Sequence, residues 1–163
     1  MLLENIRISN ISVVVKIYQP DNRIKHFENR ANYGLLFVES GELFYEQNGV
    51  RYISDSNHAL FIPKGIDYSL YCISESYTYV INFDLCTPTD FDTMQVFTPF
   101  PTERIIGFLE RMESTWNAKG SGYHFRCMSV LYRILARLCD HSPSDDADII
   151  KQARIQPSVY YLE

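Results

Sequence analysis

The sequence predicts a mainly β protein with helices at its C-terminal end, an antiparallel β-barrel followed by an α-helical hairpin. Residues 5 to about 99 form short β-branched and aromatic runs separated by turn formers, a pattern that favours a barrel or a sandwich. Beyond Pro99 and Pro101 the apolar residues recur at steps of three and four, which is typical of helices. With 163 residues, of which 46% are hydrophobic, the chain has the size of one domain with a helical appendage.

Strands are expected at residues 11–18, 33–39, 42–47, 51–54, 59–62, 68–73 and 77–83. Asn48-Gly49 is the strongest turn signal, because both central residues of a tight hairpin turn need a positive φ. Ser40-Gly41 and the turn at residues 65–67, which follows Pro63-Lys64, mark two further corners.

Two helices are expected after the barrel. The first has Thr102 as its N-cap and ends near Gly120, and its apolar positions are Ile105, Leu109, Met112 and Trp116. The second follows Gly122 and ends near Asp140, with an apolar face opposite Arg126, Arg133 and Arg137. Residues 142–163 begin with a polar stretch that is typical of a linker and continue into a helical pattern.

The overall charge limits the classes of partner that this chain can bind. A formal net charge of −5 and a pI near 5.4 argue against this chain alone binding nucleic acid, which requires a basic surface. The four cysteines form no C-x-x-C pair and are expected to be reduced. Because no run approaches the ~20 apolar residues of a membrane span and the first residues lack a secretory pattern, we expect a cytoplasmic protein without membrane contact.

Four segments carry a resemblance to a known family: Arg30-x-x-Tyr33-Gly-Leu-Leu-Phe-Val-Glu-Ser-Gly41, Asn48-Gly49-Val-Arg-Tyr52, Leu60-Phe61-Ile62-Pro63-Lys64-Gly65 and Asn82-Phe83. With the order of the parts, they resemble the arabinose-regulator (AraC) family of bacterial transcription factors. The resemblance implies a cupin-like effector-binding jelly-roll barrel over 1–99 and a two-helix dimerisation hairpin over 100–141. It also implies that 142–163 is a linker and the start of a truncated helix-turn-helix domain.

One position departs from the family pattern. Asn57-His58 stands where the family usually has Gly-Asp before the strand that leads to the Pro turn. Because Asn adopts the left-handed conformation more readily than most residues, we expect the bend to survive with Asn57 in that conformation.

No metal, other cofactor or catalytic residue is expected. Metal-binding cupins have a His three residues after the turn glycine, where this chain has Tyr68, and a His-x-His pair near Gly41, where it has Leu43-Phe44-Tyr45. His26, His58, His124 and His141 are interpreted as surface or capping residues. A small cupin enzyme, such as a sugar isomerase or a metal-dependent dioxygenase, stays the alternative, and a dimerisation module with a filled barrel is a third interpretation.

A ligand site is expected inside the barrel. The resemblance directs six residues inward, and we predict that they bind the effector: Arg30, Tyr68, Leu70, Thr78, Val80 and Asn82. Strand alternation independently places Thr78, Val80 and Asn82 on one face. Because burying unpaired polar groups is costly, these side chains need internal partners or a polar ligand, and a sugar-like effector fits this mixture. The alternatives are a packed core, an exposed loop position for Arg30 and an ordinary aromatic wall for Tyr68.

The second helix carries a possible dimer seam. Met128, Leu131, Leu135 and Leu138 recur at steps of three and four residues, which fits either a contact with a second copy or a fully intramolecular hairpin. The resemblance favours the homodimer. It also implies that contact with DNA is made only by a following domain, and residues 1–10 are the candidate lid over the effector.

Overall fold

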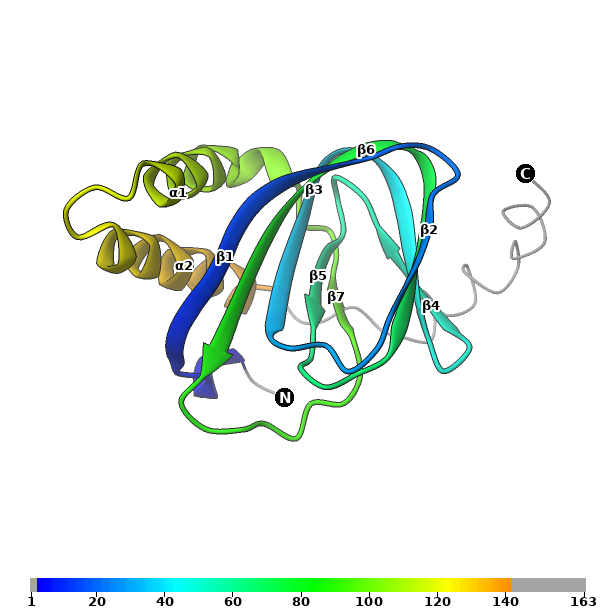
Figure 1. Ribbon diagram of the computed structural model, residues 1–163, viewed down its shortest axis with the longest axis horizontal. Helices are drawn as coiled ribbons and strands as arrows, with labels where there is room; N and C mark the ends of the chain where they lie inside the picture. Colours follow the sequence, from blue (N-terminus) through cyan, green and yellow to red (C-terminus); the bar gives the residue numbers. More distant parts are fainter. Residues whose placement is uncertain (1–2, 142–163) are drawn as a thin grey trace.

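The computed structural model describes residues 3–141, and the linker and DNA-binding start predicted for 142–163 lie outside them. The strands are β1 (Ile8–Gln19), β2 (Ile24–Phe27), β3 (Tyr33–Gln47), β4 (Val50–Ser54), β5 (Ala59–Ile62), β6 (Tyr68–Leu85) and β7 (Gln95–Phe97). Short 3-10 helices, η1 (Leu3–Asn5) and η2 (Thr102–Arg104), accompany α1 (Ile106–Ala118) and α2 (Tyr123–Cys139). Figure 1 shows α1 and α2 side by side on one side of the strands. The predicted fold class is confirmed: an antiparallel β-structure followed by two helices.

The long strands β3 and β6 form the spine of the sheet. Their strand order is β1-β6-β3-β5-β7, with β2 added to β6 and β4 added to β3, and all pairs are antiparallel. The C-terminal half of β6 pairs with β1, whereas its N-terminal residues pair with β2. The two strands therefore pass from one layer of the barrel into the other, and they place both layers around a common interior.

The structure merges strands that the sequence separates. Residues 33–39 and 42–47 belong to β3, and residues 68–73 and 77–83 belong to β6. Gly41, with φ of 92°, lies where the register between the two strands shifts, so it marks a bulge and not a corner that ends the strand. The unpredicted β2 and β7 have only four and three residues, too few for a recognisable alternation.

The sheet separates two apolar cores. One lies between the sheet and the helices and includes Tyr79, Ile81 and Phe83 from one face of β6. The other lies inside the barrel and includes Tyr68 and Leu70. Alternation along β6 thus sends one set of side chains under the helical hairpin and the other into the barrel, as the sequence predicted for residues 77–83.

The helix boundaries are partly as predicted. Helix α2 follows Gly122, which has φ of 69°. Thr102 does not cap α1; it is buried at the start of η2, and α1 begins at Ile106. Lys119 ends α1 in a left-handed conformation, one residue before the expected Gly120. Within the described part of the chain, neither helix is both long and apolar enough to cross a membrane.

The predicted dimer seam points into the chain. Leu131, Leu135 and Leu138 are 0%, 4% and 0% exposed, and Met128 packs against the same core between the helices and the sheet. These residues satisfy the intramolecular interpretation of the apolar stripe. The burial of the three leucines favours the intramolecular interpretation, and a dimer contact through this helix stays a prediction.

The turn between β4 and β5 is held by Asp55 and not by a left-handed Asn57. Asn57 is not among the described residues with positive φ. Instead, Asp55 Oδ1 accepts a hydrogen bond of 2.9 Å from the Asn57 N–H and lies 2.6 Å from His58 Nδ1. The carbonyls of Ser56 and Asn57 then accept hydrogen bonds from the N–H groups of Thr102, at the start of η2, and Phe100, two residues before it. This turn therefore fastens the barrel to the hairpin.

Replacement of Gly41 by Ala tests the bulge. A Cβ at Gly41 would overlap the Glu75 carbonyl oxygen, and the positive φ adds backbone strain. We expect Gly41→Ala to lower the free energy of unfolding by about 1–3 kcal/mol or more, measured by urea denaturation. Gly107→Ala in α1 is the matched control, because its Cβ would meet nothing within 4 Å, and it should raise stability by up to ~1 kcal/mol. Equal effects of the two substitutions would contradict this account.

The Asp55 turn predicts a pH dependence. Burial pushes the pKa of the Asp55 carboxyl upward, but the hydrogen bonds from His58 and Asn57 outweigh it, so the pKa lies below its ordinary value. The resulting stabilisation is complete above the unfolded pKa of about 3.9 and is lost as the pH falls through the folded value. We expect the urea midpoint of the wild type to exceed that of Asp55→Asn near neutrality and the gap to close in acid. Asp90→Asn, at an exposed position, should show no such gap.

Candidate functional site

A cavity of about 160 Å³ lies inside the barrel. The residues that line it are Ile17, Gln19, Phe27, Arg30, Leu36, Tyr45, Tyr68, Leu70, Thr78, Val80 and Asn82. All six residues predicted for ligand binding are among them, so the structure brings the predicted set together around one space; their binding of a ligand stays a prediction. The sequence analysis missed the other five. Alternation along 11–18 could have indicated Ile17, whereas Phe27 comes from the unpredicted β2.

The Pro turn positions Arg30. The Arg30 backbone N–H donates to the Ile66 carbonyl over 3.1 Å, and its own carbonyl accepts from the Gly65 N–H over 2.8 Å. Gly65 has φ of 84°, a conformation that favours glycine and lets the turn close against Arg30. The resulting clamp fixes the point from which the arginine side chain enters the cavity.

Two side chains of β6 then orient the guanidinium. Arg30 Nη1 donates to the Tyr68 hydroxyl over 2.6 Å, and Nη2 donates to Asn82 Oδ1. Gly34 of β3 leaves room for this arrangement, because a Cβ at that position would overlap the guanidinium. The charged group is therefore held on three sides by the protein.

Three buried polar atoms on the cavity wall lack partners. Arg30 Nε, Thr78 Oγ1 and Gln19 Oε1 have no hydrogen bond within the described residues. An orphaned buried polar group costs about 1–3 kcal/mol, so three around one space are unusual in a packed core. Among the described lining residues, Arg30 carries the one formal charge. The cavity therefore offers a cationic donor, a hydroxyl and an amide oxygen to an occupant.

The aromatic walls add apolar faces and neutral hydroxyls. The Phe27 and Tyr68 rings stack with centroids 4.8 Å apart, and the Tyr45 ring lies 6.0 Å from that of Tyr68. Burial raises the pKa of Tyr45 well above its ordinary value. Burial also raises the pKa of Tyr68, although the Arg30 charge opposes the rise. Both phenols keep their protons at neutral pH, and Tyr68, which accepts from Arg30, retains its own O–H to donate.

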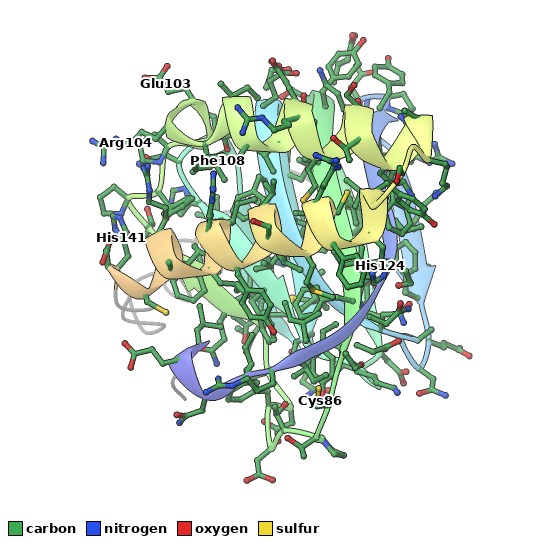
Figure 2. The ribbon with its side chains drawn as sticks, turned by 90° about the vertical axis from the view of Figure 1, so that its left-hand side faces the viewer. Cys86, Glu103, Arg104, Phe108, His124 and His141 are labelled. Carbon is green, nitrogen blue, oxygen red and sulfur yellow. The ribbon has the colours of Figure 1, made fainter. Side chains whose placement is uncertain are left out.

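The histidines lie outside the cavity lining. His26 contacts Ser69, His58 pairs with Asp55, His124 contacts Asn10, and His141 meets the edge of the Phe100 ring. Figure 2 shows His124 and His141 at opposite ends of α2. Within residues 3–141, no three His, Cys, Asp or Glu side chains gather in a group that could hold a metal ion.

The N-terminal residues do not form the expected lid. Leu3, Ile6 and Ile8 are buried in the core between the sheet and the helices. The Ile8 N–H donates to the Tyr132 hydroxyl of α2 over 2.8 Å. None of the described residues 3–10 lines the cavity, so the lid hypothesis is wrong for them; this segment secures the hairpin instead.

The fold and the cavity define a class of protein: a cupin-like antiparallel barrel followed by a helical hairpin. No family model and no curated protein matches the chain.

The similar solved structures include ToxT from Vibrio cholerae. An apo ToxT variant from strain SCE256 shares 12% identity at a TM-score of 0.57, covering 92% of this chain and 65% of that one. ToxT with a bound unsaturated fatty acid shares 12% identity at a TM-score of 0.51, covering 93% and 65%. ToxT from Vibrio cholerae O395 gives 12% and 0.52, covering 77% and 53%. The chain thus spans about two thirds or less of these proteins, and the likeness is one of fold.

Replacement of Thr78 by Val tests whether the cavity polarity is unsatisfied. Since Thr78 Oγ1 is buried without a partner among the described residues, we expect Thr78→Val to raise the free energy of unfolding by about 1 kcal/mol in urea denaturation. Thr89→Val is the control, because Thr89 Oγ1 lies 3.3 Å from the Tyr33 hydroxyl and its removal should not stabilise. Destabilisation by Thr78→Val would show that the hydroxyl has a partner after all.

Proposed function

We propose that this domain is a receptor for a small polar, anionic effector and acts as the ligand-sensing part of an AraC-like transcription regulator. The observation that carries the proposal is the set of three orphaned polar atoms around a cavity whose described lining holds one cation and no carboxylate. A ligand carboxylate would pair with Arg30, and ligand hydroxyls would pair with Thr78 and Gln19. The fold likeness to ToxT, an AraC-family regulator, supports the regulatory role.

The volume of the cavity limits the size of the effector. At about 160 Å³ it lies below the ~300–1,000 Å³ of pockets that take drug-sized ligands. One ToxT structure contains an unsaturated fatty acid, but a long acyl chain exceeds this cavity. Aromatic faces from Phe27 and Tyr68 suit the CH surfaces of a compact molecule. A small hydroxy acid or sugar acid therefore fits the proposal best.

We propose binding without catalysis. A catalytic hydroxyl needs a neighbouring base to activate it, and the described lining residues hold no His, Asp, Glu or Lys beside the hydroxyls of Thr78, Tyr45 and Tyr68. The alternative hypothesis, a small cupin enzyme, predicts a different result: purified protein would retain about one equivalent of Fe, Mn, Ni or Zn by elemental analysis. We expect no stoichiometric metal, and its presence would reverse the order of the two hypotheses.

The proposed output passes to a DNA-binding module of the kind that follows the hairpin in the AraC family. An effector can switch such a regulator only if it binds two arrangements of the protein with different affinity. Homodimerisation stays a prediction, although the three leucines of α2 are buried within the chain. Sedimentation velocity over a range of concentrations measures it.

A thermal-shift screen tests the receptor proposal. Among sugars, sugar acids and small hydroxy acids, we expect at least one carboxylate to raise the melting temperature in a concentration-dependent way, because a ligand at about 100 times its Kd stabilises by about 2.7 kcal/mol. Arg30→Met should abolish the shift. Lys64→Met, an exposed cation in the adjacent turn, should preserve it. A shift that persists in Arg30→Met would place the ligand elsewhere.

A further inference from the structure

A second hollow lies outside the barrel, between α1 and α2. It has a volume of about 420 Å³, and three arginines surround it: Arg111 from α1, and Arg126 and Arg133 from α2. Figure 2 views the molecule from the side on which α1 and α2 lie across the sheet. We call it the interhelical groove.

The arginines of the interhelical groove are available to an anion. No ion pair joins any of the three to another residue within 3–141, and Arg126 donates only from Nε, to the Ser121 carbonyl. Burial raises the pKa of Tyr79 on β6, and the charges of Glu113 and Glu110 add to the rise, so both carboxylates are within electrostatic reach of the sheet. Exposed positive charges thus concentrate on one face of a chain whose net charge is −5.

An apolar surface accompanies these charges. Phe125 at the rim is 82% exposed, the most exposed of the large hydrophobic residues described, and Met112 and Val130 form part of the floor. Aromatic residues and arginine are both enriched at protein–protein interfaces. The occupant must therefore combine negative charge with an apolar group.

The openness of the groove favours a polypeptide over a small molecule. Phe125 and the three arginines are exposed, so the outer side of the groove is open to solvent. Small-ligand sites usually bury ~70–90% of their ligand, which an open rim cannot do. A segment of another protein needs no such enclosure, because it continues beyond the groove on both sides.

We propose that the interhelical groove binds a short acidic segment of a partner protein, with carboxylates on Arg126, Arg133 and Arg111 and an apolar side chain against Phe125. Arginine pairs with carboxylates in a bidentate geometry, which gives such a contact direction as well as attraction. The surface lies on the side of the sheet opposite the barrel cavity. It is thus a protein-binding site separate from the proposed effector site, and it does not depend on that proposal.

Fluorescence anisotropy with the whole chain tests the inference. The probe is a fluorescein-labelled peptide of Asp, Glu, Leu and Phe. We expect saturable binding that weakens with salt, a loss of about tenfold or more in affinity for Arg126→Glu with Arg133→Glu, and a smaller loss for Phe125→Ala. Arg126→Gln with Arg133→Gln should change affinity in the same direction by less. Arg104→Glu is the matched control, because Arg104 is an exposed arginine at the other end of α1 (Figure 2), and affinity should not change.

Several outcomes would overturn the inference. Absence of peptide binding would contradict it, and equal binding of a version with Lys in place of Asp and Glu would remove the role of charge. Equal losses for Arg104→Glu and the groove variants would indicate a general charge effect. Sedimentation velocity provides the last check: self-association that the groove variants abolish would assign the groove to a second copy of this chain. The exposed position of Phe125 keeps the Phe125→Ala arm interpretable, since its removal leaves the core intact.

Discussion

The structure depends on the pairing of β6 with three strands at once. This 18-residue strand hydrogen-bonds to β1 and β2 along one edge and to β3 along the other. Most residues of its C-terminal half therefore face either the helical core or the barrel interior, whereas Tyr77 is 40% exposed. Tyr79, Ile81 and Phe83 hold the hairpin, while Thr78, Val80 and Asn82 shape the cavity. One strand thus supplies both the apolar surface on which the helices pack and the polar side of the cavity.

The cavity is organised around an arginine whose position the backbone fixes. The turn at Gly65 holds the Arg30 main chain, and Tyr68 and Asn82 hold its head, so the guanidinium is placed before any ligand arrives. Such preorganisation lowers the entropic cost of binding. The unpaired atoms of Thr78 and Gln19 lower the stability of the fold, because each is buried without a hydrogen-bond partner among the described residues. Buried polar atoms without hydrogen-bond partners are expected at functional sites and not in ordinary cores.

Local signals in the sequence were sufficient for part of the fold. Asn48 and Gly49 both have positive φ, as the hairpin turn requires, and Gly122 precedes α2 as expected. These features depend on one or two residues and their own backbone. Gly41 was different, because a glycine that ends a strand and a glycine that bends one have the same sequence appearance; only the partner strand distinguishes them. The same limit hid β2, whose four residues are a strand because β6 lies beside them.

The site was predictable to the extent that one strand defines it. Alternation and the family resemblance brought together Arg30 and the residues of β6, but Gln19, Phe27 and Tyr45 join the cavity only when the layers fold over one another. The stripe on α2 shows a related limit. Its spacing indicates that Leu131 and Leu135 are covered, yet the covering surface is the sheet of the same chain. An apolar pattern reports burial and does not identify the partner.

The turn at Asp55 has a mechanical consequence for the molecule. Its backbone carbonyls at Ser56 and Asn57 accept hydrogen bonds from Thr102 at the start of η2 and from Phe100 before it, while the two ends of the turn continue into β4 and β5. The hairpin is consequently clamped at its root as well as seated along its length. A displacement of the turn between β4 and β5 would therefore also displace η2 and the start of α1, to which the two hydrogen bonds connect it.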